Sequence, residues 1–121
     1  MKLKSTLFAI LASMLLATPV FTRAASAQPA PRRIEVTAQR FAFTPSEITV
    51  KKGEMVTLVL KSLDVTHGLR FKELGIETKV NKGQTSELTF TADKTGTFVG
   101  YCSVFCGSGH GQMMLTVHVV E

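Results

Sequence analysis

The sequence has no tryptophan, one tyrosine and two cysteines in 121 residues. It has no run of lysine and arginine interleaved with aromatic residues, so a nucleic-acid partner is not expected. Beyond residue 33 it has no amphipathic helical pattern of useful length, which argues against a helical fold. Its apolar run from Leu7 to Phe21 falls short of the roughly 20 residues that span a bilayer. Nothing in the sequence suggests hydrolytic chemistry. These absences leave one small globular domain.

The N-terminus predicts an export signal rather than part of the fold. Lys2 and Lys4 precede the apolar run, and Ala25-Ser26-Ala27 supplies the small-x-small pattern that a signal peptidase needs. We therefore expect a signal peptide at 1–27, a short tail at 28–33 and the domain at 34–121. The protein would then be exported, to the periplasm or another extracytoplasmic compartment. Membrane association is expected only through an uncleaved N-terminal segment or a membrane partner.

The rest of the chain predicts short strands. Apolar residues alternate with polar ones in several segments, which is the period of a half-buried strand. The segments are Ile34–Ala38, Ile48–Val50, Val56–Leu60, Leu88–Phe90 and Met113–Val119, with a further strand-like segment at His67–Phe71. Turn residues separate them at Pro45-Ser46, Lys52-Gly53, Asn81-Lys82-Gly83 and Lys94-Thr95-Gly96. This spacing predicts an all-β fold, an antiparallel Greek-key β-sandwich.

Four side chains that can bind a metal lie close together near the C-terminus. Cys102, Cys106, His110 and Met113 fall within twelve residues. Soft sulfur ligands with imidazole select copper, and a long, weak methionine ligand is typical of copper sites that transfer single electrons. His67, at the start of a predicted strand, is the candidate for a further ligand. A sandwich can bring a strand end from the middle of the chain beside a loop near its end.

Each candidate also has a simpler interpretation. Cys102 and Cys106 could form a disulfide in an exported protein. His67 could be a strand-end histidine with no ligand role, and Met113 is in phase with the apolar residues that follow it, so it could belong to the core alone. His118 is out of phase with that inward set and is predicted to be a surface histidine, not a ligand.

The C-terminal motif resembles the dinuclear copper (CuA) cupredoxin domain of cytochrome c oxidase subunit II and of nitrous-oxide reductase. The likeness rests on the CxxxCxxxHxxM spacing that begins at Cys102 and on Asp64-Val65-Thr66-His67. In addition, Phe41–Pro45 with Val50–Gly53 looks like the opening hairpin of many cupredoxins. A second cysteine at the position where that family bridges two coppers distinguishes the chain from a mononuclear blue-copper protein.

The resemblance implies a ligand set for two copper ions. The sulfur atoms of Cys102 and Cys106 would bridge both metals. One copper would be completed by His67 and Met113, and the other by His110 and the backbone carbonyl of Val104. From its position alone, Asp64 is expected to orient His67 or the nearby loop through a hydrogen bond, a common arrangement around metal ligands.

The chain also departs from the oxidases. Position 104 is commonly a glutamate there, whose side chain helps form a magnesium site against the catalytic subunit, but here it is Val104. The tryptophan-containing cluster that receives electrons from cytochrome c has no counterpart, nor do the paired membrane helices that normally precede the domain. The chain looks like a free-standing, exported version of the domain, although a place in a larger oxidase or reductase stays open.

Three functions fit these residues. The leading hypothesis is an electron carrier, not an enzyme, that passes one electron at a CuA-type centre to or from a cytochrome or a respiratory oxidase or reductase component. The second is a periplasmic protein that stores or delivers copper with the same ligands. The third, a small thiol oxidoreductase, is weaker, because redox dithiols usually sit two residues apart at a helix start.

Overall fold

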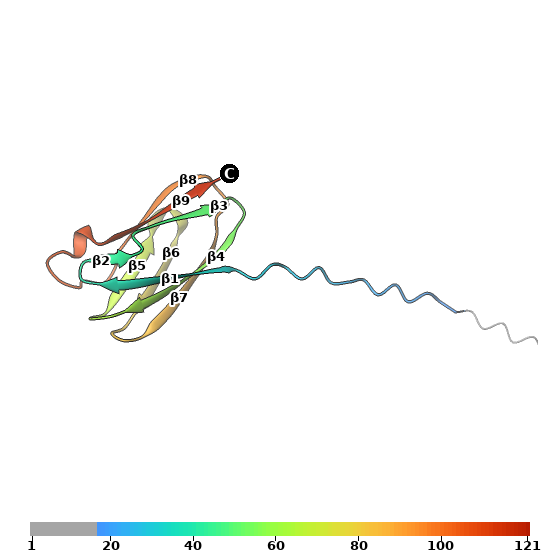
Figure 1. The fold of residues 1–121 in the computed structure, drawn as a ribbon, viewed down its shortest axis with the longest axis horizontal. Helices are drawn as coiled ribbons and strands as arrows, with labels where there is room; N and C mark the ends of the chain where they lie inside the picture. The colour runs from blue at the N-terminus through green and yellow to red at the C-terminus, as the bar shows by residue number, and fades with distance from the viewer. Residues whose placement is uncertain (1–16) are drawn as a thin grey trace, which may run out of the picture.

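The computed structural model describes residues 17–121. Residues 17–31 have no regular secondary structure, are exposed, and extend away from the domain (Figure 1). Most of the apolar run of the predicted signal peptide lies outside the described residues, and cleavage after Ala27 stays a prediction. Within residues 17–121, no helix has the length and apolar character needed to cross a bilayer.

Strands dominate the domain. The strands are β1 (Arg32–Gln39), β2 (Ala42–Thr44), β3 (Glu47–Lys51), β4 (Met55–Ser62), β5 (His67–Phe71), β6 (Ile76–Val80), β7 (Thr85–Thr91), β8 (Gly96–Tyr101) and β9 (Met114–Val120). Two single-turn 3-10 helices, η1 (Lys72–Leu74) and η2 (His110–Gln112), complete the regular structure of the described residues. The expected all-β fold is confirmed.

The strands form two sheets packed face to face. One sheet has the order β2-β1-β4-β7 and the other β3-β9-β8-β5-β6. Most neighbours are antiparallel, but β1 runs parallel to β4, and β3 runs parallel to β9. The β-sandwich prediction is therefore confirmed, whereas its purely antiparallel character was wrong. Alternation of apolar residues reports which face of a strand is buried and carries no information about strand direction.

The expected opening hairpin between Phe41–Pro45 and Val50–Gly53 does not form either. β2 pairs with β1 in the four-stranded sheet, whereas β3 pairs with β9 in the other. The chain changes sheets at Pro45-Ser46. Proline has no N–H to continue a ladder, so the pairing of β2 ends there.

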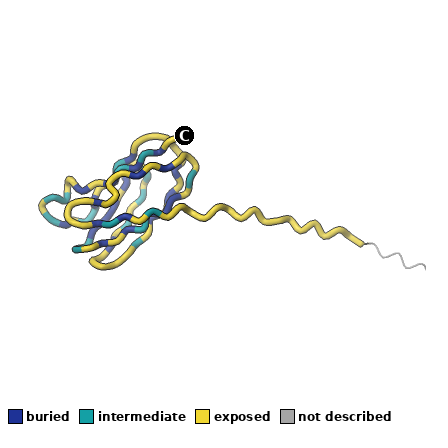
Figure 2. The backbone as a smooth tube through the Cα atoms, in the orientation of Figure 1, coloured by how far each residue is buried: buried dark blue, intermediate teal, exposed yellow. Residues whose placement is uncertain are grey.

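The core lies between the two sheets and is filled by the inward residues of the alternating strands (Figure 2). Most inward positions carry a side chain with almost no exposed surface. Examples are Val36, Phe43, Leu58, Leu60, Leu69, Phe71, Leu115 and Val117. Removal of this apolar surface from water is the main stabilising term for the fold.

Three strands, β2, β6 and β8, were not predicted from the sequence. In β8 one of the two inward positions is Gly100, where a Cβ would lie 2.7 Å from the ring of Phe71. Because glycine takes this inward position and leaves room for Phe71, β8 lacks the alternating apolar residue by which a strand is recognised in the sequence. β6 is an edge strand in which Val80 is the one fully buried residue, so its alternation is weak.

Three connections meet at the end of the sandwich that is remote from residues 17–31 (Figure 1). They are the β1–β2 turn at Arg40-Phe41, the β4–β5 loop at 63–66 and the β8–β9 loop at 102–113. The backbone N–H of Arg40 donates to Asp64, and its guanidinium donates to the Cys106 carbonyl, so the turn is in direct contact with both loops. The candidate ligands come from this end.

Shortening a core side chain in β4 should destabilise the protein. We expect Leu58→Ala to lower the free energy of unfolding by about 2–5 kcal/mol, because Leu58 is fully buried and its removal leaves a cavity. The neighbouring Val59 is only half-buried, so Val59→Ala should cost about 1 kcal/mol or less. Urea denaturation of the metal-free protein measures both. Equal losses of unfolding free energy in the two variants would contradict the inward orientation of Leu58 and the outward orientation of Val59.

Candidate metal centre

The β8–β9 loop is closed at its base by strand pairing. Tyr101 lies opposite Met114, and the N–H of Cys102 donates to the carbonyl of Met113 over 3.0 Å. Between these two points the chain turns at Gly107, whose φ of 140° favours glycine, and then enters η2. The loop thus begins and ends with a candidate ligand, and its two ends are held side by side.

Two thiols lie side by side under the loop. The Sγ atoms of Cys102 and Cys106 are 3.7 Å apart, both side chains are buried at 4% exposure, and both cysteines are free. Each sulfur has several lone pairs, so two thiolates at this separation can each contact the same pair of metal ions. A mononuclear blue-copper site would use only one of these thiolates.

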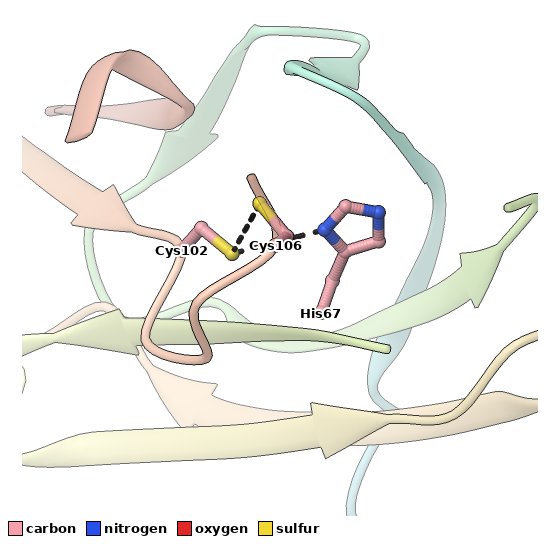
Figure 3. Close-up of side chains that lie close together, drawn as sticks. All are labelled: His67, Cys102 and Cys106. Atoms are coloured by element: carbon pink, nitrogen blue, oxygen red, sulfur yellow. Dashed lines mark hydrogen bonds between the residues drawn. The ribbon is translucent and has the colours of Figure 1, made fainter. Parts of the chain in front are cut away.

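His67 faces the thiols from β5 (Figure 3). It is fully buried, and its Nδ1 lies 3.8 Å from the Sγ of Cys102. With Cys106 these two residues form a group whose ligand atoms all lie within 4.8 Å of one another. The far ring nitrogen, Nε2, lies 2.7 Å from Oδ1 of Asp64 and donates its proton to it. The Nδ1 lone pair is therefore free to bind a metal beside Cys102.

The remaining candidates surround the same two sulfur atoms. The Sγ of Cys106 lies 3.8 Å from Nδ1 of His110 and 3.9 Å from Sδ of Met113. The Cys102 thiol donates to the carbonyl of Val104 over 3.2 Å. Met113 is fully buried, whereas His110 is partly exposed and packs against the ring of Phe105, which is 78% exposed. All six groups singled out in the sequence therefore come together, and His118 lies apart on the outer face of β9, near Thr97 and Glu47.

The hydrogen bonds around Asp64 keep its carboxyl group ionised beside His67. Burial alone would raise the pKa of this carboxyl group, but the backbone N–H of Arg40, the ring of His67 and the N–H of Val65 all donate to it. The net effect holds the pKa of Asp64 below its usual value. The carboxylate is thus charged at neutral pH and keeps the proton of His67 on Nε2.

Burial has the opposite consequence for the thiols. It raises the pKa of Cys106 to about 11, with a further contribution from the neighbouring Cys102, while the guanidinium of Arg40 partly opposes the shift. Without a metal, the Cys106 thiol therefore stays protonated at neutral pH. Metal binding needs the thiolate, so uptake of a metal must release this proton.

Sequence reasoning missed two residues that shape the site. The Nε of Arg40 donates to the carbonyl of Cys106 over 2.7 Å. The ring of Phe41 lies where a Cβ on Gly107 or Gly109 would be, at 2.9 and 2.5 Å respectively. Both residues belong to the β1–β2 turn, 60 or more positions from the loop they contact. No local pattern in the sequence marks such a contact.

The donor set fits copper. It combines two cysteine sulfurs, two imidazole nitrogens and a thioether with one backbone carbonyl, and soft sulfur with imidazole favours copper over the harder cations. Zinc would accept the same cysteines and histidines but does not change oxidation state.

Comparison with known protein families also points to a copper-binding domain. A profile of the family described as the cupredoxin-like domain matches residues 7–117. The nitrous-oxide reductase of Cupriavidus necator is 39% identical over 84 residues, which cover 66% of this chain and 13% of that protein. Cytochrome c oxidase subunit 2 of Thermus thermophilus is 31% identical over 88 residues, which cover 73% of this chain and 65% of that protein. The chain thus spans less than two thirds of the length of each.

Solved structures share the fold. The periplasmic domain of subunit II of cytochrome oxidase (CoxB) of Bradyrhizobium japonicum superposes with a TM-score of 0.70 at 23% identity, over 78% of this chain and 87% of that one. Auracyanin A, a blue copper protein of Chloroflexus aurantiacus, gives 0.62 at 22% identity, over 75% of this chain and all of its own. These structures show a shared fold only. Evidence for common ancestry comes from the family profile, which spans most of the chain, and from the relatives above 30% identity. The chain belongs to the cupredoxin-like domain family and is homologous to parts of nitrous-oxide reductase and of cytochrome c oxidase subunit 2.

Proposed function

We propose that the protein is an electron carrier that binds two copper ions at a CuA-type centre. The observation that supports this most directly is the pair of buried thiols 3.7 Å apart, each with its own outer partners. Nδ1 of His67 lies beside Cys102, while Nδ1 of His110 and Sδ of Met113 lie beside Cys106. A single metal ion would leave part of this arrangement unused.

In this proposal both metals would be held by the thiolates of Cys102 and Cys106. His67 and Met113 would complete the ligands of one copper, and His110 and the carbonyl of Val104 those of the other. When bound, the copper pair would supply a one-electron redox couple. No residue of the centre is assigned a role in acid–base catalysis, and no substrate site is proposed.

The protein's own residues keep this centre rigid and dry. Asp64 fixes the ring orientation and the tautomer of His67. The burial of His67, Cys102, Cys106 and Met113 keeps water from the sulfur atoms. The paired ends of the β8–β9 loop hold Cys102 and Met113 side by side before metal arrives. Little rearrangement is then needed when the charge changes, which favours fast electron transfer.

The names of the relatives support a proposal about redox partners. Those relatives are named as oxidase subunits and as a reductase, so we propose that this protein exchanges electrons with a cytochrome or with a component of a respiratory oxidase or reductase. One related structure is described as a periplasmic domain, which supports export of this chain and agrees with its predicted signal peptide.

The first test is copper content together with electron paramagnetic resonance. Protein beginning at Gln28 and reconstituted with reduced thiols should bind two coppers and show one unpaired electron coupled equally to both nuclei. One copper, or none with a Cys102–Cys106 disulfide, would refute the dinuclear centre. Two coppers that pass rapidly to a chelator under reducing conditions would instead favour storage or delivery.

The bridging and terminal ligands should differ in their response to substitution. We expect Cys106→Ser to abolish the shared-electron spectrum, because serine cannot replace a bridging thiolate. Met113→Leu should keep both coppers and mainly change the reduction potential, since a thioether binds weakly. Spectroscopy and voltammetry on the two variants measure this. Retention of the dinuclear spectrum in Cys106→Ser would contradict the ligand assignment.

Removal of the Asp64 carboxylate should weaken copper binding without removing any ligand. Outer partners of metal-binding histidines typically contribute about 10- to 100-fold in affinity, so a loss of that size is expected for Asp64→Ala in competition with a chelator. Asp64→Asn, which keeps an oxygen for the His67 proton, should recover part of it. Asp93→Ala, at an exposed site between β7 and β8, is the control. An Asp64→Ala protein with unchanged affinity and spectrum would sink this role.

A further inference from the structure

Arg40 contacts both halves of the candidate centre. Its backbone N–H donates to Oδ2 of Asp64 over 2.8 Å, and the other oxygen of that carboxylate accepts the proton of His67. Its side-chain Nε donates to the carbonyl of Cys106 over 2.7 Å. One residue of the β1–β2 turn is therefore hydrogen-bonded to the loop before β5 and to the loop between β8 and β9.

These contacts close a ring around the site. The ring runs from His67 through Asp64 and Arg40 to Cys106, and returns to His67 through the Sγ of Cys102 at 3.7 and 3.8 Å. Without the Arg40 side chain, the ring would be open between the loop that carries Cys106 and the loop that orients His67. Strand pairing fixes the two ends of the β8–β9 loop, but it does not reach Cys106.

We propose that Arg40 is a positioning residue that sets the location of Cys106 relative to His67. The inference rests on the proposed copper centre and goes beyond its ligand set. The role depends on the position of the Nε donor against the carbonyl of Cys106 and not on the charge of the guanidinium. The ring of the adjacent Phe41 packs on Gly107 and Gly109, so two consecutive residues of the β1–β2 turn contact the β8–β9 loop.

The role of the hydrogen bond can be separated from that of the charge. In Arg40→Gln the amide nitrogen occupies the position of Nε, so a donor remains while the charge is lost. In Arg40→Met a methyl group takes the same position and neither donor nor charge remains. Arg40→Lys keeps the charge but has a methylene at that position. Arg33→Met, on the adjoining strand β1, removes a guanidinium whose partner is the exposed Glu87, and it serves as the control.

The metal-free protein provides the first readout. Hydrogen exchange of the amides from Cys102 to Met113 should become faster in Arg40→Met and Arg40→Lys, and should stay close to wild type in Arg40→Gln and Arg33→Met. An unchanged urea midpoint shows that the whole domain is still folded. Exchange that is the same in all four variants and the wild type would overturn the proposal.

The copper-loaded protein provides the second readout. Arg40→Met and Arg40→Lys should release copper to a chelator about 10- to 100-fold faster than wild type, the range typical of lost outer partners, and Arg40→Gln should not. Fast copper release from Arg40→Gln together with a wild-type rate from Arg40→Lys would show that the charge matters and the position of the donor does not. That result would also overturn the proposal. If the wild-type protein fails to bind two coppers, the proposed function fails, whereas the exchange experiment still decides the role of Arg40.

Discussion

Pairing of β8 with β9 is the constraint on which the candidate centre depends. It holds Cys102 and Met113 together at the base of a loop that contains four of the proposed side-chain ligands. Because the strands are already joined, ordering the residues between them costs less entropy than closing a free loop of the same length. The β1–β2 turn and the β4–β5 loop add contacts to a loop whose two ends are already held by this pairing.

The two histidines of the site lie in different surroundings. His67 is fully buried and bound to Asp64, so its orientation is fixed by the core. His110 is partly exposed, stands on a single turn of 3-10 helix, and packs against a phenylalanine that is itself largely exposed. The centre therefore has one side set into the sandwich and one side near the surface. Any redox partner would have access from the side of His110.

The sequence predicts the parts of this structure that leave local traces. Alternating residues identify five strands, and a strand-like segment identifies β5. The spacing of Cys102, Cys106, His110 and Met113 identifies the loop, because each pattern lies within a short segment. His67 required a motif in addition, since a lone histidine at a strand end has no distinctive pattern. The parallel pairs and the contact of Arg40 with Cys106, 66 positions away, arise only when the chain folds.

The place of β9 in its sheet governs when the site can form. Although it is the last strand of residues 17–121, it lies between β3 and β8 rather than at an edge. Without β9, β3 would lose the one sheet neighbour that it has among the described residues, and one side of β8 would be exposed. Such non-local pairing is slow to form, and its unpaired strand edges are prone to aggregation. The frame of the β8–β9 loop is complete only when β9 has paired with both neighbours, so a metal ion would meet the assembled ligands only after the whole domain has folded.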